Sequence, residues 1–202
     1  MEANKSTKGT PQHLPSMCQQ VSLFAKNFFK HPKMLGSIIP SSPFLVKSML
    51  DQVNWQQARV LVEYGPGVGT FTQEILRRMH PEATLIVLET NEDFVEFLNQ
   101  AFTDPRMEVI HDSAENIQTI LMQRELSDAD YVISGIPFST LPDNIKENIL
   151  RATQKALKAD GAFLLYQFSP TILTDLRKTF SSVERSFQPL NLLPAHYYYC
   201  AP

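Results

Sequence analysis

The sequence of 202 residues is poor in cysteine and in long apolar runs, and each shortage excludes a class of protein. Its two cysteines, Cys18 and Cys200, lie far apart and without metal-ligand spacing. We therefore expect reduced thiols in a cytosolic protein, and no bound metal. No apolar run approaches the roughly 18 residues that span a bilayer, and we recognise no signal peptide. A membrane-spanning or disulfide-built protein is not expected.

The charge is small in total but unevenly placed. The net charge is −3, yet residues 1–50 hold six lysines and one acid, Glu2, which leaves the remainder strongly acidic. A basic segment on an acidic chain predicts an anionic partner for the N-terminal part. By composition we divide the chain into a disordered tail (1–16), an amphipathic helix with a capping segment (17–50) and one globular domain (51–202).

Glycine is also scarce, and three of the seven glycines stand at alternate positions, Gly65, Gly67 and Gly69. A short apolar run precedes them, and helical spacing of apolar residues follows, with Thr70 as the expected N-cap. Because glycine has no Cβ, such a strand-to-helix turn lets the backbone approach a ligand closely. The spacing is neither the dinucleotide fingerprint nor a Walker loop. The alternative is a turn that only packs the helix on its strand.

Strand and helix patterns alternate along the rest of the domain. Short β-rich runs occur at 60–63, 84–88, 108–110, 131–133, 162–166, 183–187 and 196–199, and helical patterns at 71–79, 94–102, 121–126, 144–157 and 171–180. This alternation predicts an α/β fold with a mostly parallel, doubly wound sheet. Only a short loop joins the last two strands, so we expect that pair to be antiparallel.

A polar residue follows each of the first four strands: Glu63, Glu89, Asp112 and Ser134. In an open α/β sheet the ligand lies at the carboxyl ends of the strands, where these residues would meet. Glu89 stands 20 residues beyond Gly69, the separation at which an acid accepts hydrogen bonds from ribose. Asp112 would meet an adenine amine, and Glu63 would offset a positive charge. The alternative for each is a solvated strand end.

The segment from 17 to 33 has the pattern of an interfacial helix. Its two faces differ in chemistry, with Phe24, Phe28 and Phe29 on one and Lys26, Lys30 and Lys33 on the other. Such a helix can lie on an anionic membrane, or it can dock its apolar face on the domain. After it, two prolines in the stretch 36–44 favour an extended loop, and Ser41 or Ser42 would cap a helix that begins near Pro43.

Five stretches together resemble one family. They are Phe-x-x-x-Pro-Lys with Gly-Ser-Ile-Ile-Pro-Ser-Ser-Pro (28–43), Glu-Tyr-Gly-Pro-Gly-Val-Gly-Thr-Phe-Thr (63–72), Leu-Glu-Thr-Asn-Glu-Asp-Phe (88–94), Ser-Gly-Ile-Pro-Phe (134–138) and Asn-Leu-Leu-Pro-Ala-His-Tyr (191–197). From about residue 24 to 199 the chain resembles the bacterial phospholipid N-methyltransferases, which are similar to the ribosomal RNA adenine dimethyltransferases. The resemblance implies a Rossmann-like class I methyltransferase fold.

The resemblance implies that the cofactor is S-adenosylmethionine, with S-adenosylhomocysteine as its product. The residues that it assigns to the cofactor are Ser41, Ser42, Glu63, Gly65, Gly67, Gly69, Thr70, Glu89, Thr90, Asp112, Ser113 and Ser134. His111 departs from the pattern, because a glycine is expected there.

The resemblance implies methylation of the amine of a membrane phospholipid, from phosphatidylethanolamine towards phosphatidylcholine. Gly135, Ile136 and Pro137 would frame the amine, and Lys33 or Lys47 would meet the lipid phosphate. Adenine-N6 methyltransferases carry Asn or Asp where this chain has Gly135, so RNA adenine is disfavoured and no nucleic-acid partner is expected. We expect a cytoplasmic monomer, peripheral on the inner face of the membrane.

The acceptor amine has a pKa of about 10 in water, like lysine, and must lose a proton before it attacks. Candidates for a base are Tyr64, His196 and Tyr197, although sheet packing also explains the last two. Three alternatives stay open: methylation of RNA or another soluble amine, methylation of an ornithine lipid, and a cofactor-binding protein without catalysis.

Overall fold

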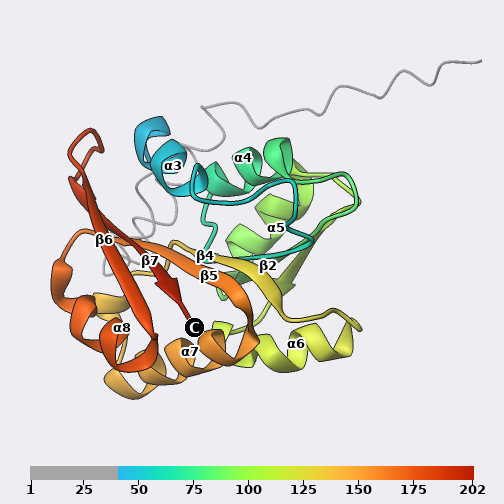
Figure 1. Cartoon of the computed structure of the whole chain (residues 1–202). Coiled ribbons are helices and arrows are strands. Elements are labelled where there is room, and N and C mark those ends of the chain that lie inside the picture. The colour runs from blue at the N-terminus through green and yellow to red at the C-terminus, as the bar shows by residue number, and fades with distance from the viewer. Residues whose placement is uncertain (1–40) are drawn as a thin grey trace, which may run out of the picture.

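The computed structural model describes residues 41–202 as a seven-stranded sheet with helices on both faces (Figure 1). The predicted tail, the amphipathic helix and Lys33 lie outside the described residues. The strands follow the order β3-β2-β1-β4-β5-β7-β6. Their bounds are β1 Val60–Tyr64, β2 Thr84–Glu89, β3 Met107–His111, β4 Ala129–Ser134, β5 Leu157–Gln167, β6 Ser182–Gln188 and β7 Ala195–Ala201.

The first five strands are parallel, and β7 runs antiparallel between β5 and β6. The predicted fold class and the antiparallel last pair are therefore confirmed. The chain order reverses at β1, which pairs with β2 on one side and with β4 on the other. The carboxyl ends of these strands form the crevice in which ligands of open α/β sheets bind.

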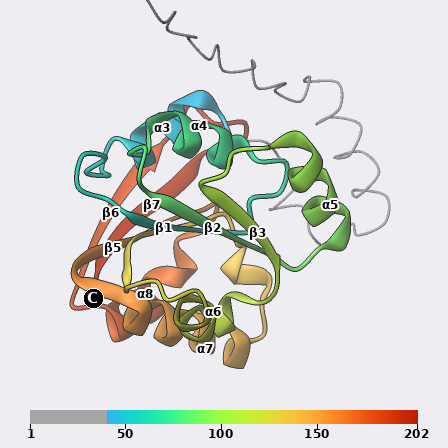
Figure 2. The same ribbon diagram turned by 90° about the vertical axis from the view of Figure 1, so that its right-hand side faces the viewer.

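The helices sort into two layers (Figure 2). Helices α3 (Pro43–Leu50), α4 (Thr70–Arg78) and α5 (Glu92–Ala101) cover one face, and α6 (Ile117–Gln123), α7 (Asp143–Ala156) and α8 (Leu173–Thr179) cover the other. Short 3-10 turns, η2 (Ala114–Asn116), η3 (Phe138–Thr140) and η4 (Pro170–Ile172), precede α6, α7 and α8. The central strand β1 is buried along its whole length because both of its faces are covered.

Local chemistry explains the helix ends. Ser42 caps α3 by accepting a hydrogen bond from the Leu45 amide at 3.2 Å, and Pro43 occupies the first turn, as expected. The prediction that Thr70 caps α4 is wrong: Gly69 is the N-cap, with φ of +80°, and Thr70 is already helical. The left-handed backbone of Gly69 turns the chain into the helix without a side-chain cap.

The helix predicted at 121–126 lies earlier in the chain, at Ile117–Gln123. Its buried residues Ile117, Ile120 and Leu121 have helical spacing and face the core. Strand β5 is also longer than predicted, because Leu157 already pairs with Ala129 ahead of an irregularity in the ladder. The core extends on both faces of the sheet and leaves the carboxyl edge open for a site.

Candidate functional site

A cavity of about 360 Å³ opens at the carboxyl ends of β1, β2 and β4. Seven predicted site residues line it: Gly65, Glu89, Thr90, Ser113, Gly135, Ile136 and Pro137. Six lining residues were not predicted: Phe94, Ala114, Thr140, Leu141, Ile145 and Ile149. Pockets of this size, mostly apolar with a few polar groups, are typical of small-molecule sites.

The glycine turn folds against the turn that follows β4. Gly65, Gly67 and Gly69 all have positive φ, of 60°, 56° and 80°. A Cβ on Gly65 would lie 3.2 Å from Ile136 Cγ1, and one on Gly135 would lie 2.7 Å from the carbonyl oxygen of Gly65. The turn therefore needs glycine both for its backbone angles and for the close approach of the two chain segments.

Glu89 ends β2 at the cavity wall, and backbone amides hold its carboxylate. Its Oε1 accepts hydrogen bonds from the amides of Thr90 and Asn91, at 2.8 and 2.9 Å, and Gly67 donates a further backbone bond. Burial raises the pKa of Glu89, and these backbone bonds oppose the shift. The side chain is fixed in a position to accept hydrogen bonds from a ligand's hydroxyl groups.

The end of β3 supplies Ser113 to the cavity, while Asp112 lies behind it. Asp112 Oδ1 accepts from the Ser113 amide at 2.6 Å and from Asn116 Nδ2 at 2.7 Å. Ser113 caps η2 by accepting from the Glu115 amide at 3.2 Å. The exposed His111 contacts the Thr90 carbonyl at 3.0 Å through Nε2. Asp112 thus orients the Ser113 backbone rather than lining the cavity.

Glu63 lies behind the glycine turn, fully inside the protein. Its Oε2 accepts a hydrogen bond from the Thr72 hydroxyl at 2.7 Å, and both side chains are buried. Burial raises the pKa of Glu63 to about 8; the Thr72 bond opposes this shift, while the negative charge of Glu89 adds to it. The Glu63 carboxyl is therefore neutral over a wide range of pH.

Tyr166 is also buried and is affected by the charge of Glu63, and the sequence did not single it out. Its hydroxyl shares a side-chain hydrogen bond with Ser41 and lies 3.6 Å from where a Gly135 Cβ would be. Its ring stacks on Phe71 with centroids 5.8 Å apart. Burial raises the pKa of Tyr166, and the charge of Glu63 adds to the shift. The hydroxyl therefore stays protonated beside the Gly135 turn.

Two buried side chains hold the turn that follows β4. Ser134 accepts a hydrogen bond from the Ile136 amide at 3.2 Å through its hydroxyl oxygen. Gln167 Nε2, at the end of β5, donates to the Ile136 carbonyl at 2.8 Å. Ser134, which was predicted to bind the cofactor, is fully buried and acts on this turn. Gln167 is a further functional candidate that the sequence reasoning missed.

The predicted base candidates lie away from the cavity. Tyr64 is fully buried, and its hydroxyl lies 3.3 Å from Thr153 Oγ1 on α7, in the core. Burial raises the Tyr64 pKa well above its usual range, which makes it a poor base. The His196 ring packs on Phe187 with centroids 5.0 Å apart. Tyr197 packs against the core on the face of the sheet that α3, α4 and α5 cover. Burial lowers the pKa of His196.

Ser42 and Thr70 also lie outside the cavity. The Ser42 amide donates to Asn191 Oδ1 at 2.8 Å, and its hydroxyl donates to the Leu190 carbonyl at 2.7 Å. Thr70 lines a separate depression between α3 and α4, together with Lys47. Ser42 therefore joins the start of α3 to the loop between β6 and β7.

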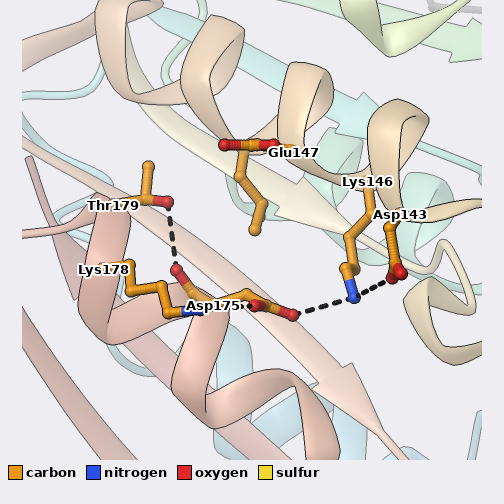
Figure 3. A pocket seen from close by; sticks show the side chains of 7 residues that line it. Asp143, Lys146, Glu147, Asp175, Lys178 and Thr179 are labelled. Carbon is orange, nitrogen blue, oxygen red and sulfur yellow. Dashed lines mark hydrogen bonds and ion pairs between the residues drawn. The ribbon is translucent and has the colours of Figure 1, made fainter.

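A second cavity, of about 320 Å³, lies between α7 and α8 (Figure 3). Lys146 pairs with Asp143 on its own helix and reaches across the cavity to Asp175 on α8, each at 2.9 Å, and Lys178 lies 3.8 Å from Asp175. Each of its charged residues has an ion-pair partner, which for Glu147 is Arg151 outside the cavity, and none of the predicted site residues among 41–202 lines it. We assign it a structural role in joining the two helices.

The six lining residues that were not predicted have only an indirect signal in the sequence. Ile145 and Ile149 are one turn apart on α7, and Phe94 occupies the first turn of α5, so each pattern indicated a core face. Their position over the open edge depends on the crossing of helix and sheet, which periodicity does not give. Within residues 41–202 no His, Cys, Asp and Glu cluster could hold a metal, and no helix is long and apolar enough to cross a membrane.

Comparison with known proteins agrees with this geometry. The model of the ribosomal RNA adenine dimethylase family matches residues 28–169. The chain belongs to this family. Its cavity and its strand order therefore belong to an S-adenosylmethionine-dependent methyltransferase. The resemblance to a class I methyltransferase noted in the sequence is confirmed.

Two relatives show how far similarity within this family extends. An ornithine lipid N-methyltransferase from Singulisphaera acidiphila is 34% identical over 180 residues, which are 88% of this chain and 94% of that protein. A ribosomal RNA small subunit methyltransferase A from Mycoplasma capricolum subsp. capricolum is 26% identical over 113 residues. That match covers 54% of this chain and only 40% of the relative.

Solved structures share the fold. A precorrin-6y C5,15-methyltransferase from Geobacter metallireducens has a TM-score of 0.61 at 18% identity, over 77% of this chain and 85% of that one. The structure of PigF with S-adenosylhomocysteine has a TM-score of 0.58 at 14% identity, over 79% of this chain and 55% of that one. At these identities the likeness concerns the fold alone.

The residues of the cavity suit S-adenosylmethionine, the cofactor of the family. The fixed Glu89 carboxylate suits ribose hydroxyls, and the apolar lining residues Phe94 and Ala114 suit a flat base. The glycine turn leaves its wall free of side chains next to Gly135. Glu89, Thr90, Ser113 and the glycine turn would hold the cofactor, which supplies an electrophilic methyl group when bound.

Proposed function

We propose that this chain transfers a methyl group to the primary amine of a membrane lipid headgroup. The observation that carries the proposal is the similarity to an ornithine lipid N-methyltransferase along 94% of that protein. The match to a ribosomal RNA methyltransferase is lower in identity and covers 40% of the relative.

The geometry of the β4 turn supports an aliphatic amine over RNA adenine. At Gly135 a side chain would meet the Gly65 carbonyl, because even a Cβ would lie 2.7 Å from it. An amide side chain that accepts a hydrogen bond from an adenine amine therefore has no room at this position. The acceptor amine would instead meet backbone groups of the turn.

The site favours the neutral form of the amine. The side of the cavity next to the turn is apolar, with Ile136, Leu141, Ile145 and Ile149 among its lining residues. Desolvation in such surroundings lowers the pKa of an ammonium group, and loss of the proton frees the lone pair for attack. Alignment of a neutral amine with the methyl group then supplies most of the rate gain.

We propose Tyr166 as the residue that orients the amine, in place of Tyr64. Its hydroxyl is the buried polar group beside Gly135, and Ser41 fixes its direction. Because its pKa is raised, the hydroxyl stays protonated, and its oxygen can accept a hydrogen bond from an amine N–H. Gln167 and Ser134 hold the neighbouring Ile136 in place from two sides.

Two lipid amines fit this class, phosphatidylethanolamine and an ornithine lipid, and the similarity to an ornithine lipid N-methyltransferase favours the second. Both headgroups carry a primary amine and an anionic group, a phosphate in one and a carboxylate in the other. The described residues that line the cavity include no Lys or Arg for either anion, and Lys47 pairs with Asp51, just after α3. We propose the ornithine lipid as the preferred acceptor and phosphatidylethanolamine as the second candidate.

A labelled-methyl assay on the full chain tests the proposal. Vesicles contain phosphatidylglycerol with either ornithine lipid or phosphatidylethanolamine, phosphatidylglycerol alone is the amine-free control, and a ribosomal RNA fragment is a separate substrate. We expect labelled lipid by chromatography in the amine vesicles only, with more label in the ornithine lipid. Label in the RNA and none in either amine lipid would refute the proposal.

The place of action is part of the same proposal. A lipid acceptor puts the enzyme on a membrane, which we take to be the inner face of the bacterial membrane with the protein as a peripheral monomer. The helix at 17–33, with its phenylalanines and lysines, stays a prediction for this contact, since it lies outside the described residues. Deleting residues 1–33 should weaken vesicle binding, and unchanged binding would contradict that role.

A further inference from the structure

Large exposed apolar side chains gather at one corner of the domain. Of the six in residues 41–202, four lie at the start of α3 and in the β6–β7 loop, which Ser42 and Asn191 join. We call them the hairpin-tip surface: Phe44, Leu190, Leu192 and Leu193. Phe187 lies on the other face of the hairpin, where it pairs with His196, and Met122 stands alone on α6. Figure 1 shows the hairpin tip projecting beside α3.

Hydrogen bonds fix this tip with its leucines outward. Asn191 is buried; its Oδ1 accepts from the Ser42 amide at 2.8 Å, and its Nδ2 donates to the Leu193 carbonyl at 2.8 Å. Gln188 Nε2 donates to the Ser48 hydroxyl at 2.9 Å. The polar groups of the loop point inward, while the Leu192 side chain is 75% exposed. An apolar surface held open in this way indicates an interaction site.

The hairpin-tip surface stands on the same edge of the sheet as the cavity. In the ladder Gln167, the last residue of β5, pairs with His196, and Ala195 pairs with Gln188. The loop between β6 and β7 therefore extends from the carboxyl edge, where the cavity opens. A partner that contacts the tip therefore faces the edge of the sheet at which the cavity opens.

Charge indicates what that partner is. From 186 to 195 the chain has no acidic or basic residue. Ser42, which bonds to the loop, is where residues 1–40 join the domain, and that segment carries five lysines and one acid. Apolar side chains next to a basic segment match a bilayer with anionic headgroups.

We propose that the hairpin-tip surface inserts its leucines into an anionic bilayer and brings the cavity to the headgroups. The proposal rests on the proposed lipid acceptor. It adds a second membrane contact, built on a rigid part of the fold, to the helix expected at 17–33. The lysines before Ser41 would meet headgroups around the inserted side chains.

Fluorescence quenching tests insertion directly. Leu192→Trp in the full chain is compared with Met122→Trp, a matched replacement of an exposed apolar side chain on α6 (71% exposed), with Trp55 as the shared background. With phosphatidylglycerol vesicles that carry brominated acyl chains, we expect the emission of the Leu192→Trp variant to shift to the blue and lose intensity. The Met122→Trp variant should keep its emission. Equal quenching of both variants, or of neither, would overturn the proposal.

Sedimentation with phosphatidylglycerol vesicles gives the affinity. Leu192→Glu and Leu193→Glu should each weaken binding about tenfold, because each removes the burial of one leucine, whereas Met122→Glu should bind as the wild type does. Light scattering and the emission of Leu192→Trp without vesicles show whether something other than a bilayer covers the hairpin-tip surface. A dimer that dissociates in Leu192→Glu, or emission already blue-shifted without vesicles, would show that another copy or residues 1–40 cover the surface.

The outcomes separate this surface from the proposed function. Loss of vesicle binding in Leu192→Glu, with no lipid methylated by the wild type, leaves the surface standing and refutes the lipid acceptor. Methylation of vesicle lipid that Leu192→Glu and Leu193→Glu leave unchanged, together with unchanged binding, refutes the surface alone. If the surface and the lipid acceptor are both correct, Leu192→Glu should raise the KM for vesicle lipid and leave kcat unchanged.

Discussion

The carbonyl oxygen of Gly65 lies 2.7 Å from the position that a Cβ on Gly135 would occupy. The Gly135 amide also donates to the Tyr64 carbonyl at 2.8 Å, so the turns after β1 and β4 touch through their backbones. One of these turns belongs to the cofactor side of the cavity and the other to the proposed acceptor side. Any change in their spacing therefore alters the alignment of the two reactants.

Replacing Gly135 by alanine should cost both stability and activity. The added Cβ forces the two turns apart, at about 1–3 kcal/mol of unfolding free energy. Misalignment should lower kcat about 10- to 100-fold. Urea unfolding and the labelled-methyl assay measure the two effects. Ser139→Ala, an exposed position four residues on, is the control and should change neither. Full activity of Gly135→Ala would show that the contact does not matter.

Tyr166→Phe and Tyr64→Phe should have different effects, because only Tyr166 has its hydroxyl beside the acceptor turn. Tyr166→Phe keeps the ring on Phe71 but removes the hydroxyl, and we expect about a tenfold loss of kcat/KM with a changed pH profile. Tyr64→Phe should lose about 0.5–1.5 kcal/mol of stability, since its hydroxyl meets Thr153, and keep its pH profile. A pH profile that moves only in Tyr64→Phe would restore Tyr64 as a candidate for the base.

The fold was predictable because apolar strands and amphipathic helices alternate regularly along the chain. Apolar runs such as β1 and β2 are buried on both faces, and each is followed by a helix with one apolar face. Element ends were less accurate for physical reasons. A glycine with positive φ replaced the expected Thr70 cap, and the weak apolar pattern at 121–126 hid a helix that begins at Ile117.

The site was predictable where it follows the strand ends and not where it depends on helix crossings. Gly65 and Glu89 line the cavity because the carboxyl ends of parallel strands meet at one edge. Tyr166 was missed because its position in β5 looks like core, and only the fold brings its hydroxyl beside Ser41 and Gly135. A side chain at a strand end can either line the cavity or hold a neighbouring turn, depending on its direction. Ser134 holds the turn, because its hydroxyl accepts from the Ile136 amide.

Glu89→Gln should weaken cofactor binding without unfolding the protein. Backbone amides hold Oε1 of Glu89, and the change removes the charge that strengthens hydrogen bonds to ligand hydroxyls. We expect S-adenosylhomocysteine to bind about 10- to 100-fold more weakly in calorimetry. Glu82→Gln, on an exposed turn, is the matched control. Unchanged affinity in Glu89→Gln would remove this residue from the cofactor site.

The buried Glu63 should make the unliganded protein less stable as the pH rises from 4.5 towards 8. Its folded pKa is about 8, against 4.5 as the ordinary value, because burial disfavours the charge. In this window the folded state keeps a proton that the unfolded state has lost, so stability falls by up to about 1.4 kcal/mol per pH unit and levels off above pH 8. Glu63→Gln should flatten this slope in urea unfolding, while Glu82→Gln keeps it. Parallel slopes for wild type and Glu63→Gln would mean that the Glu63 carboxyl ionises as freely in the folded chain as in the unfolded one.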